Sequence, residues 1–245
     1  MEVHAHAHTA RKKWTHYFWE FLMLFLAVFC GFLAEYQLEH KIEKDRELKY
    51  MESMIEDLVS DSTQFASNRR ARIRRLEMID SMIYLLSLPD FKNHTSSIYF
   101  FGRAISPPLN IFPNDRTIQQ LKSSGSLRLI RKTDVSNNIM AYDQEMRLHL
   151  SQLGDEVEMR AEYRQLVRNI FDGKVFNSML NNSKIIERPK NNPSLFKADP
   201  ESINALIGEA QYFKKADQQQ VQRIAELIDL ASALIKMIKK EYHLK

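Results

Sequence analysis

The sequence predicts an all-α protein, with a single N-terminal transmembrane helix that continues into an elongated helical bundle or coiled-coil-like extramembrane domain. Two observations predict this fold class. An apolar run near the N-terminus is flanked by aromatic residues, and the rest of the chain is poor in Gly and Pro but rich in good helix formers. We expect three parts: a cytoplasmic tail over 1–13, a transmembrane helix over 14–36 and a periplasmic helical domain over 37–245.

The apolar run extends from Phe21 to Ala34. With its flanks it reaches the roughly 20 residues that a transmembrane helix needs. Aromatic side chains that favour the headgroup region lie on both sides: Trp14, Tyr17, Trp19 and Tyr36. A cleaved signal peptide is the alternative, but Phe32 and Ala34 make a poor cleavage site. Lipid attachment at Cys30 is disfavoured by the bulky Phe29 before it.

Small and acidic residues share one side of this helix: Glu20, Ala27, Gly31 and Ala34. Small residues four apart let helix backbones approach closely in a membrane, so this side predicts a helix–helix contact that holds Glu20 protonated or paired. In the alternative interpretation, Glu20 reaches the near interface and the small residues are incidental.

Charges beside the apolar run predict its orientation. Arg11, Lys12 and Lys13 precede the run, and Glu35 and Glu39 follow it. The positive-inside rule therefore places the N-terminus in the cytoplasm and most of the chain in the periplasm, as a single-pass protein of the inner membrane.

Alternating histidines in the tail are weak candidates for a metal site: His4, His6 and His8. An extended chain would point them the same way, but a short tail offers no second layer of residues to fix the imidazoles. A weakly chelating tail is the alternative, and no cofactor is expected.

Residues 37–88 predict one long helix, because no Pro or Gly lies between Gly31 and Pro89. Its apolar residues follow a heptad seam interrupted by polar residues. We assign the a positions to Leu48, Ile55, Ser62, Arg69, Leu76 and Ile83. We assign the d positions to Met51, Leu58, Phe65, Arg72, Ile79 and Leu86. The basic cluster over 69–75 lacks interleaved aromatics, so we expect a solvated face or pairing with acids rather than nucleic-acid binding.

The remaining helices are expected over 114–124, 134–172 and 199–242, after a loop over 89–113. Asn114 is predicted to cap the first of these, and Asp199 followed by Pro200 predicts the start of the last. The buried side of 134–172 is assigned to Ile139, Tyr142, Met146, Leu150, Leu153, Val157 and Leu166. Glu156 and Glu158 are assigned to a solvated face. Arg69 or Arg72 opposite Asp217 would fix the register of the first and last helices.

Two stretches carry a resemblance to a known family. They are RTIQQLKSSGSLRLIRK over 116–132 and EVHAHAH with YFWEFLMLFLAVFCGFLAEY near the N-terminus. Both resemble an uncharacterised family of small single-pass membrane proteins common in Bacteroidota, with a His-containing tail and a QLKSSG-LRLIR-like motif. The resemblance implies a Gram-negative inner membrane with the domain in the periplasm, and it implies no activity. Ser126 departs from the Asn or Gly expected there.

This motif is the candidate interaction patch: Arg116, Lys122, Ser123, Ser124, Gly125, Arg128 and Arg131. Free amides at a turn beside arginines can hold an anion or a carboxylate terminus. In the structural alternative, Gly125 reverses the chain, the serines satisfy the helix end and the arginines pair with acids.

No Gly-rich phosphate loop, HExxH, CxxC or GxSxG motif occurs, and the single Cys forms no disulfide framework, so we predict that the protein is not an enzyme. We expect a membrane-anchored structural or interaction protein of the bacterial envelope. Its expected partners are membrane lipid, further copies of itself and other envelope membrane proteins, and not nucleic acid. The alternative is a sensor or accessory subunit of a larger inner-membrane machine.

Overall fold

The computed structural model describes residues 14–183 and 185–244, and their secondary structure is helical apart from one isolated bridge between Leu180 and Ile186. The elements are α1 Trp14–Leu86, η1 Phe91–His94, α2 Thr95–Ala104, α3 Arg116–Ser123, η2 Ser126–Leu129, α4 Thr133–Ile170, α5 Gly173–Ser178 and α6 Pro200–Tyr242. The chain forms two units, Met1–Lys49 and Tyr50–Lys245, and α1 contributes residues to both. The predicted all-helical class is confirmed for the described residues.

The first unit is the N-terminal part of α1. Its large apolar side chains are exposed, and the rings of Phe21, Phe25 and Phe29 stack on one another with centroids 6.2 and 5.9 Å apart. Within the part of the chain that the structure describes, α1 is the one helix long and apolar enough to cross a membrane. Signal sequences and core helices of soluble proteins share this property.

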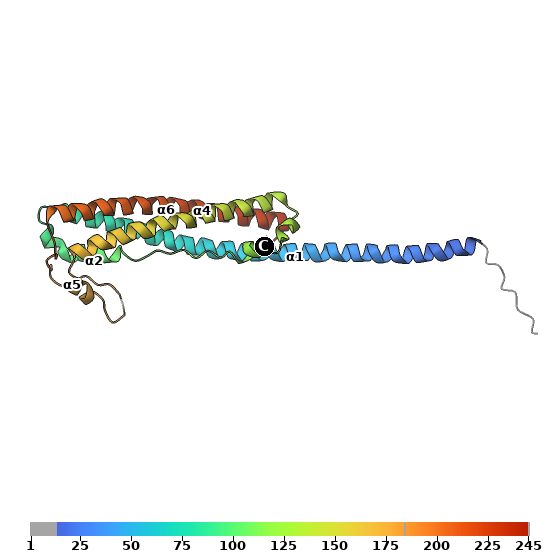
Figure 1. The fold of residues 1–245 in the computed structure, drawn as a ribbon, viewed down its shortest axis with the longest axis horizontal. Coiled ribbons are helices and arrows are strands. Elements are labelled where there is room, and N and C mark those ends of the chain that lie inside the picture. Colours follow the sequence, from blue (N-terminus) through green and yellow to red (C-terminus); the bar gives the residue numbers. More distant parts are fainter. Residues whose placement is uncertain (1–13, 184, 245) are drawn as a thin grey trace, which may run out of the picture. The chain divides into compact units, whose positions relative to one another are not determined.

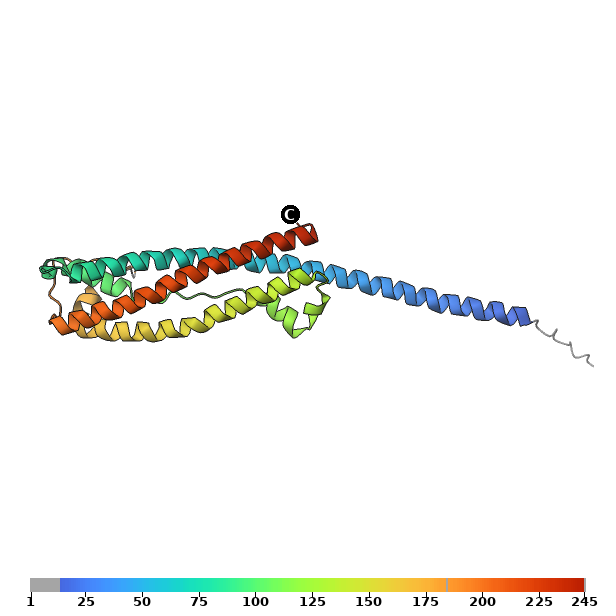
Figure 2. The same ribbon diagram turned by 90° about the horizontal axis from the view of Figure 1, so that it is seen from above.

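The second unit is built on α1, α4 and α6, which run side by side (Figures 1 and 2). Buried positions in each helix alternate at intervals of three and four residues, which keeps one stripe facing the neighbouring helices. In α1 the stripe is Met51, Met54, Leu58, Asp61, Phe65, Asn68, Arg72, Arg75, Ile79, Met82 and Leu86. In α6 it is Ile203, Leu206, Ala210, Phe213, Asp217, Gln220, Ile224, Leu227, Ala231, Leu234 and Ile238.

Half of the heptad assigned to α1 is wrong. The assigned d positions are buried or nearly so, whereas the assigned a positions are only partly buried. The second buried series is instead Met54, Asp61, Asn68, Arg75 and Met82. The sequence favoured the series of Ile55 and Ile83 because these residues are apolar, whereas three residues of the buried series are polar.

The buried side assigned to α4 is also wrong in its middle. Leu150 and Val157 are 36% and 58% exposed, whereas His149, Glu156 and Arg160 face the interior. The predicted burial of Ile139, Tyr142 and Met146 is confirmed. The centre of this helix therefore turns a polar stripe inward and apolar side chains outward.

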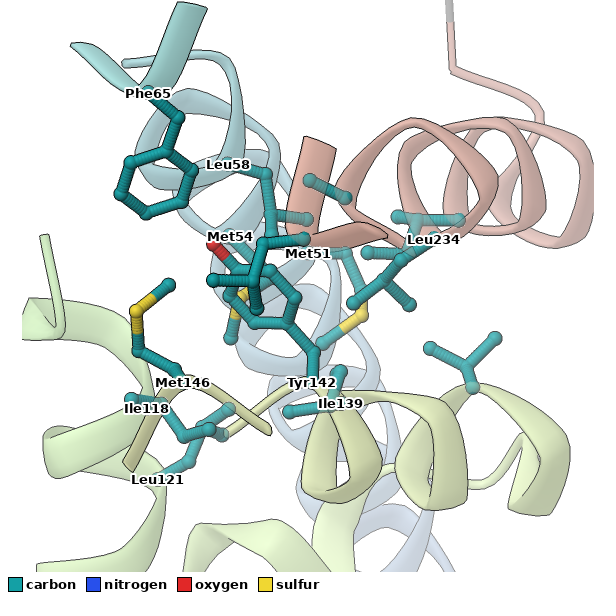
Figure 3. Close-up of a cluster of buried hydrophobic side chains, with 14 of the residues drawn as sticks. Met51, Met54, Leu58, Phe65, Ile118, Leu121, Ile139, Tyr142, Met146 and Leu234 are labelled. Atoms are coloured by element: carbon teal, nitrogen blue, oxygen red, sulfur yellow. The ribbon is translucent and has the colours of Figure 1, made fainter. Parts of the chain in front are cut away.

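Two apolar cores lie at the two ends of the second unit. The first joins α1 from Met51 to Phe65 with α3, the start of α4 and the end of α6, and Figure 3 shows their side chains pointing toward one another. The second joins α1 from Ile79 to Leu86 with α2, the end of α4 and the start of α6. In this unit α1 and α4 therefore run in the same direction, and α6 runs in the opposite one.

Residues 105–115, the return segment, run back along α1 in an extended conformation. Polar side chains from successive turns of α1 bind its backbone, so that groups without a helical partner are satisfied. The contacts are Arg75 Nη1 to Pro107 O, 3.1 Å; Arg72 Nη2 to Leu109 O, 3.1 Å; Asn68 Nδ2 to Asn110 O, 3.1 Å; Gln64 Nε2 to Phe112 O, 2.9 Å; and Asn114 N to Asp61 Oδ1, 2.7 Å.

The expected loop over 89–113 contains a helix, α2, which corrects that prediction. Ile98 and Tyr99 are buried in the second apolar core. Gly102 lies so close to Phe171 that a Cβ there would sit 2.7 Å from the ring. A residue without a side chain thus lets α2 pack against the end of α4.

The helix ends follow the expected chemistry in two places out of three. The Asp199 side chain accepts a hydrogen bond from Ser202 N at 3.0 Å, and Pro200 begins α6, which confirms that start signal. Gly125 adopts φ 65°, a left-handed conformation, just after α3. Asn114 does not cap α3, because Asp115 occupies the N-cap position without a side-chain cap bond.

Candidate functional site

Five charged side chains meet between the two apolar cores and form what we call the ionic layer: Arg72, Arg75, Glu156, Arg160 and Asp217. The arginines at 72 and 75 come from α1, the next two residues from α4 and the aspartate from α6. None is more than 8% exposed. They occupy the inward stripe of each helix, so the heptad spacing itself places them in the interior.

Asp217 is the centre of the layer. Its Oδ1 accepts from Arg72 Nη1 at 2.6 Å and from Arg75 Nη2 at 2.5 Å, and its Oδ2 accepts from Arg75 Nε at 2.5 Å. The predicted pair of Arg72 and Asp217 is confirmed. Arg69 takes a different partner, because its Nε donates to Val221 O at 3.3 Å.

Glu156 completes the layer from α4. Its Oε2 lies 2.8 Å from Arg72 Nη2, and its Oε1 accepts from Arg75 Nη2 at 3.1 Å and from Arg160 Nη2 at 3.2 Å. Burial alone would raise the pKa of Glu156, but the charges and hydrogen bonds of Arg72 and Arg75 outweigh it and lower that pKa. The assignment of Glu156 to a solvated face is wrong, whereas Glu158 is exposed.

The remaining donors of the two α1 arginines are also used. Arg72 Nε donates to Asn68 Oδ1 at 2.9 Å, and further donors bind the return segment. The Arg75 guanidinium lies over the Phe213 ring, 4.7 Å from its centroid. Arg160 Nε is buried without a hydrogen-bond partner among the described residues. Because the other charged groups of the layer pair between helices, the cluster is suited to fixing helix alignment, since any slip would leave buried charges unpaired.

His149 is a second buried polar group next to the layer. It is 1% exposed and borders a groove of about 640 Å³ between α4 and α6. Within residues 14–183 and 185–244, neither of its ring nitrogens has a hydrogen-bond partner. Burial and the positive charges of Arg72 and Arg223 lower the pKa of His149 to about 4. The neutral imidazole can therefore offer one donor and one acceptor to a polar group in the groove.

The candidate interaction patch is largely engaged in contacts within the chain. Arg116 Nε donates to Asp57 Oδ1 at 2.9 Å, and Lys122 pairs with Asp143. Ser124 Oγ donates to Gln120 O at 2.6 Å. Ser123 and Arg128 are exposed, and Arg131 is exposed with a partner of its own. The geometry is that of the structural alternative: a left-handed turn at Gly125, serines on a helix end and two cations paired with acids.

Sequence reasoning missed the two α1 carboxylates beneath this patch. Asp57 Oδ2 accepts from Thr117 N at 3.0 Å and from Thr117 Oγ1 at 2.7 Å. Asp61 Oδ2 accepts from the Tyr142 hydroxyl at 3.0 Å, and burial raises the pKa of Asp61. Their spacing from Leu58 and Phe65 on the buried stripe was the available signal.

The four residues proposed for a membrane helix contact lie in the first unit. Ala27, Gly31 and Ala34 are exposed, and a Cβ at Gly31 would meet nothing within 4 Å. The Glu20 carboxylate lies 3.4 Å from His16 Nε2. Helix approach at the small residues stays a prediction.

His4, His6 and His8 lie outside the described residues. Among the residues that the structure describes, no group of three or more His, Cys, Asp or Glu side chains could hold a metal ion.

Comparison of the chain with protein-family models, with curated proteins and with solved structures gives no match.

Proposed function

We propose that the chain is a membrane-anchored structural or interaction protein of the bacterial envelope, and that it is not an enzyme. Its extramembrane part is an elongated helical bundle that holds partners or organises a membrane complex. One observation carries the proposal: the N-terminal part of α1 exposes a continuous set of large apolar side chains, from Trp14 to Leu38. Such a surface is stable only against lipid or protein.

The ionic layer supports a structural role for the second unit. Its carboxylates each bind at least two guanidinium groups and are buried, so neither is available as a general base or nucleophile. The same contacts weigh against nucleic-acid binding. In the basic cluster over 69–75, Arg72 and Arg75 are buried and paired, which leaves Arg70 and Arg74 exposed.

The proposed topology is that of a single-pass inner-membrane protein, with the tail over 1–13 in the cytoplasm and residues 37–245 in the periplasm. Arg11, Lys12 and Lys13 before the apolar run support this orientation. The resemblance to the Bacteroidota family points the same way. Its partners are lipid, further copies of the chain through Ala27, Gly31 and Ala34, and other envelope membrane proteins.

The test combines topology with assembly state. Single cysteines at exposed Gln219 and at Thr9, in a chain whose Cys30 is replaced by Ala, are labelled with an impermeant maleimide in intact spheroplasts. We expect labelling at 219 and protection at 9, and the reverse pattern would overturn the orientation. Mass photometry in detergent then reports the assembly, for which a strictly monomeric chain would contradict self-association.

The groove at His149 favours one alternative, a sensor or accessory subunit of a larger inner-membrane machine. A neutral buried imidazole beside a groove of about 640 Å³ is typical of a site that receives a polar group. Crosslinking in native membranes separates the two functions. Crosslinks between copies of this chain support the scaffold, and one foreign subunit in fixed proportion supports the accessory role.

A further inference from the structure

A second groove, which we call the arginine groove, lies where the end of α2 and the return segment meet the C-terminal part of α4. Its volume is about 510 Å³, and three of its lining residues are arginines: Arg103, Arg164 and Arg168. Among the described residues, no acidic side chain lines it. A groove of this size accommodates a small molecule rather than a macromolecule.

The three guanidinium groups are not neutralised by the chain. Within residues 14–183 and 185–244, none of them forms an ion pair, and Arg103 Nε is buried without a hydrogen-bond partner. Arg164 Nη2 donates to Ser106 O at 2.8 Å, which orients the side chain but does not compensate its charge. This contrasts with the ionic layer, where Arg160 of the same helix α4 and the two α1 arginines pair with carboxylates.

Helix geometry adds to this excess of positive charge. Arg160, Arg164 and Arg168 are four residues apart on α4, so they lie on one face, where like charges repel. Burial lowers the pKa of Arg160. The carboxylate of Glu156 opposes this shift, whereas the positive charges of Arg75 and Arg164 add to it. A bound anion would relieve this repulsion.

The other wall of the groove is apolar. Phe176, Val167 and Ile186 line it together with Pro107 and Pro108. The Arg103 guanidinium lies over the Phe176 ring, 5.2 Å from its centroid. Stacking on an aromatic face holds a guanidinium in place while its edge donors stay available for a planar or tetrahedral anion.

We propose that the arginine groove binds a small ligand that carries a phosphate or carboxylate group joined to an apolar group. The anion binds Arg103, Arg164 and Arg168, and the apolar group packs on Phe176 and Ile186. A soluble aryl or alkyl anion and an anionic lipid headgroup share this chemistry. The proposal does not depend on the membrane anchor or on self-association.

The probes are phenyl phosphate, inorganic phosphate, uncharged phenol and dioctanoyl phosphatidylglycerol, titrated calorimetrically into the full-length chain in dodecyl maltoside. We expect one phenyl phosphate per chain, with inorganic phosphate weaker by about tenfold because it lacks the apolar contact. Tighter binding of the phosphatidylglycerol identifies a lipid source for the anion, and tighter binding of phenyl phosphate identifies a soluble source.

Variants locate the site. Arg168→Gln alters an exposed residue that has no partner among the residues that the structure describes, so it should weaken phenyl phosphate about tenfold without unfolding the protein. Phe176→Leu should weaken phenyl phosphate more than inorganic phosphate, because it removes the apolar wall as well as the ring that supports Arg103. The matched control is Arg70→Gln, an exposed arginine on α1, which should change neither affinity.

Three results would each overturn the proposal. The first is phenol binding as tightly as phenyl phosphate, because the arginines would then contribute nothing. The second is equal affinity in Arg168→Gln and Arg70→Gln. The third is the absence of saturable binding of either phosphate or of the phospholipid up to about 10 mM.

Discussion

Asp217 accepts three hydrogen bonds from two guanidinium groups in the middle of the second unit, and it is completely buried. Removing this carboxylate costs more than the pair itself contributes, because the three buried arginines then have only the carboxylate of Glu156 to share. The layer therefore specifies how α1, α4 and α6 align. When these helices are in register, each charged group of the layer has a partner, whereas a shifted register would leave charges unpaired.

Asp217→Asn should lower the free energy of unfolding by about 3 to 5 kcal/mol, since Arg72 and Arg75 lose one of the two carboxylates that they share. Urea unfolding followed by circular dichroism measures this. Asp229→Asn, at an exposed position of the same helix, is the control and should cost little. The double variant Arg72→Met with Asp217→Leu should recover part of the loss, and a single variant no worse than the control would contradict the role of the layer.

His149 should make the protein sensitive to mild acid. Its pKa is lowered from 6.5 to about 4 in the folded chain, so the unfolded chain binds more protons between those values. The free energy of unfolding contributed by this residue is therefore complete above about pH 6.5 and falls as the pH drops toward 4.

His149→Leu should flatten this dependence by on the order of 2 kcal/mol between pH 7 and pH 4.5, read from urea midpoints at the two values. The groups around the imidazole stay in place, namely Arg72, Arg223 and Glu156. His94→Gln changes a partly exposed histidine and should keep the original dependence. An unchanged slope in the Leu variant would show that other groups cause the acid sensitivity.

At the scale of elements, the return segment shows how a long helix can organise a stretch that has no regular structure. Arg75, Asn68 and Asp61 each bind its backbone, and they follow one another at intervals of about two turns along α1. The segment runs along α1 toward the N-terminal end of that helix and places α3 beside Asp57. There the amide and the hydroxyl of Thr117 both donate to the Asp57 carboxylate. The polar residues of the α1 stripe thus determine where α3 docks.

Asp57→Ala should detach the start of α3, because the Thr117 amide and hydroxyl lose their acceptor. We expect a loss of about 2 to 3 kcal/mol in the free energy of unfolding. Hydrogen–deuterium exchange should accelerate over 114–124 and stay unchanged over 203–213. Glu52→Ala, one exposed turn away on α1, is the matched control, and equal exchange in the two variants would contradict this docking role.

The positions of most helices were predictable from the sequence, because capping residues and the spacing of apolar residues indicate them. Asp199 with Pro200 specified the start of α6. The missed helix, α2, is rich in aromatic and β-branched residues, whose helix propensity is low, and it forms because Ile98 and Tyr99 are buried.

The ionic layer was only partly predictable. The spacing of its residues is that of a buried stripe, whereas their charge is typical of the surface. Arg72 and Asp217 interrupt their seams in register, and that coincidence predicted their pairing. Glu156 follows Tyr142 and His149 at intervals of seven, so spacing alone would have placed it inside. Leu150 and Val157 were assigned to the buried side instead, because they are apolar. The sequence around Glu156 does not show that oppositely charged side chains lie on another helix.

At the scale of the whole molecule, the proposed function requires that the apolar segment of α1 find apolar surroundings. Gly31→Leu tests whether these include a second copy. A Cβ at Gly31 meets nothing within its own chain, so helix content should not change, whereas close approach between copies should be lost.

We therefore expect mass photometry in detergent to shift from oligomer to monomer for Gly31→Leu. Phe29→Trp, an increase in bulk at an exposed apolar position on the opposite side of the helix, should leave the oligomer intact. If both variants assemble as the original chain does, the segment is a tether and the contact lies elsewhere.

The ionic layer also determines when its charges can pair during synthesis of the chain. Arg72 and Asp217 are 145 residues apart in the chain, so at about 5 to 20 residues per second the ribosome makes the arginine roughly 7 to 30 s before its counterion. Until α6 emerges, Glu156 is the one carboxylate of the layer that has been made, and three guanidinium groups share it. We therefore expect a chain truncated before α6, which lacks Asp217, to be digested by proteases faster than the chain that contains this helix.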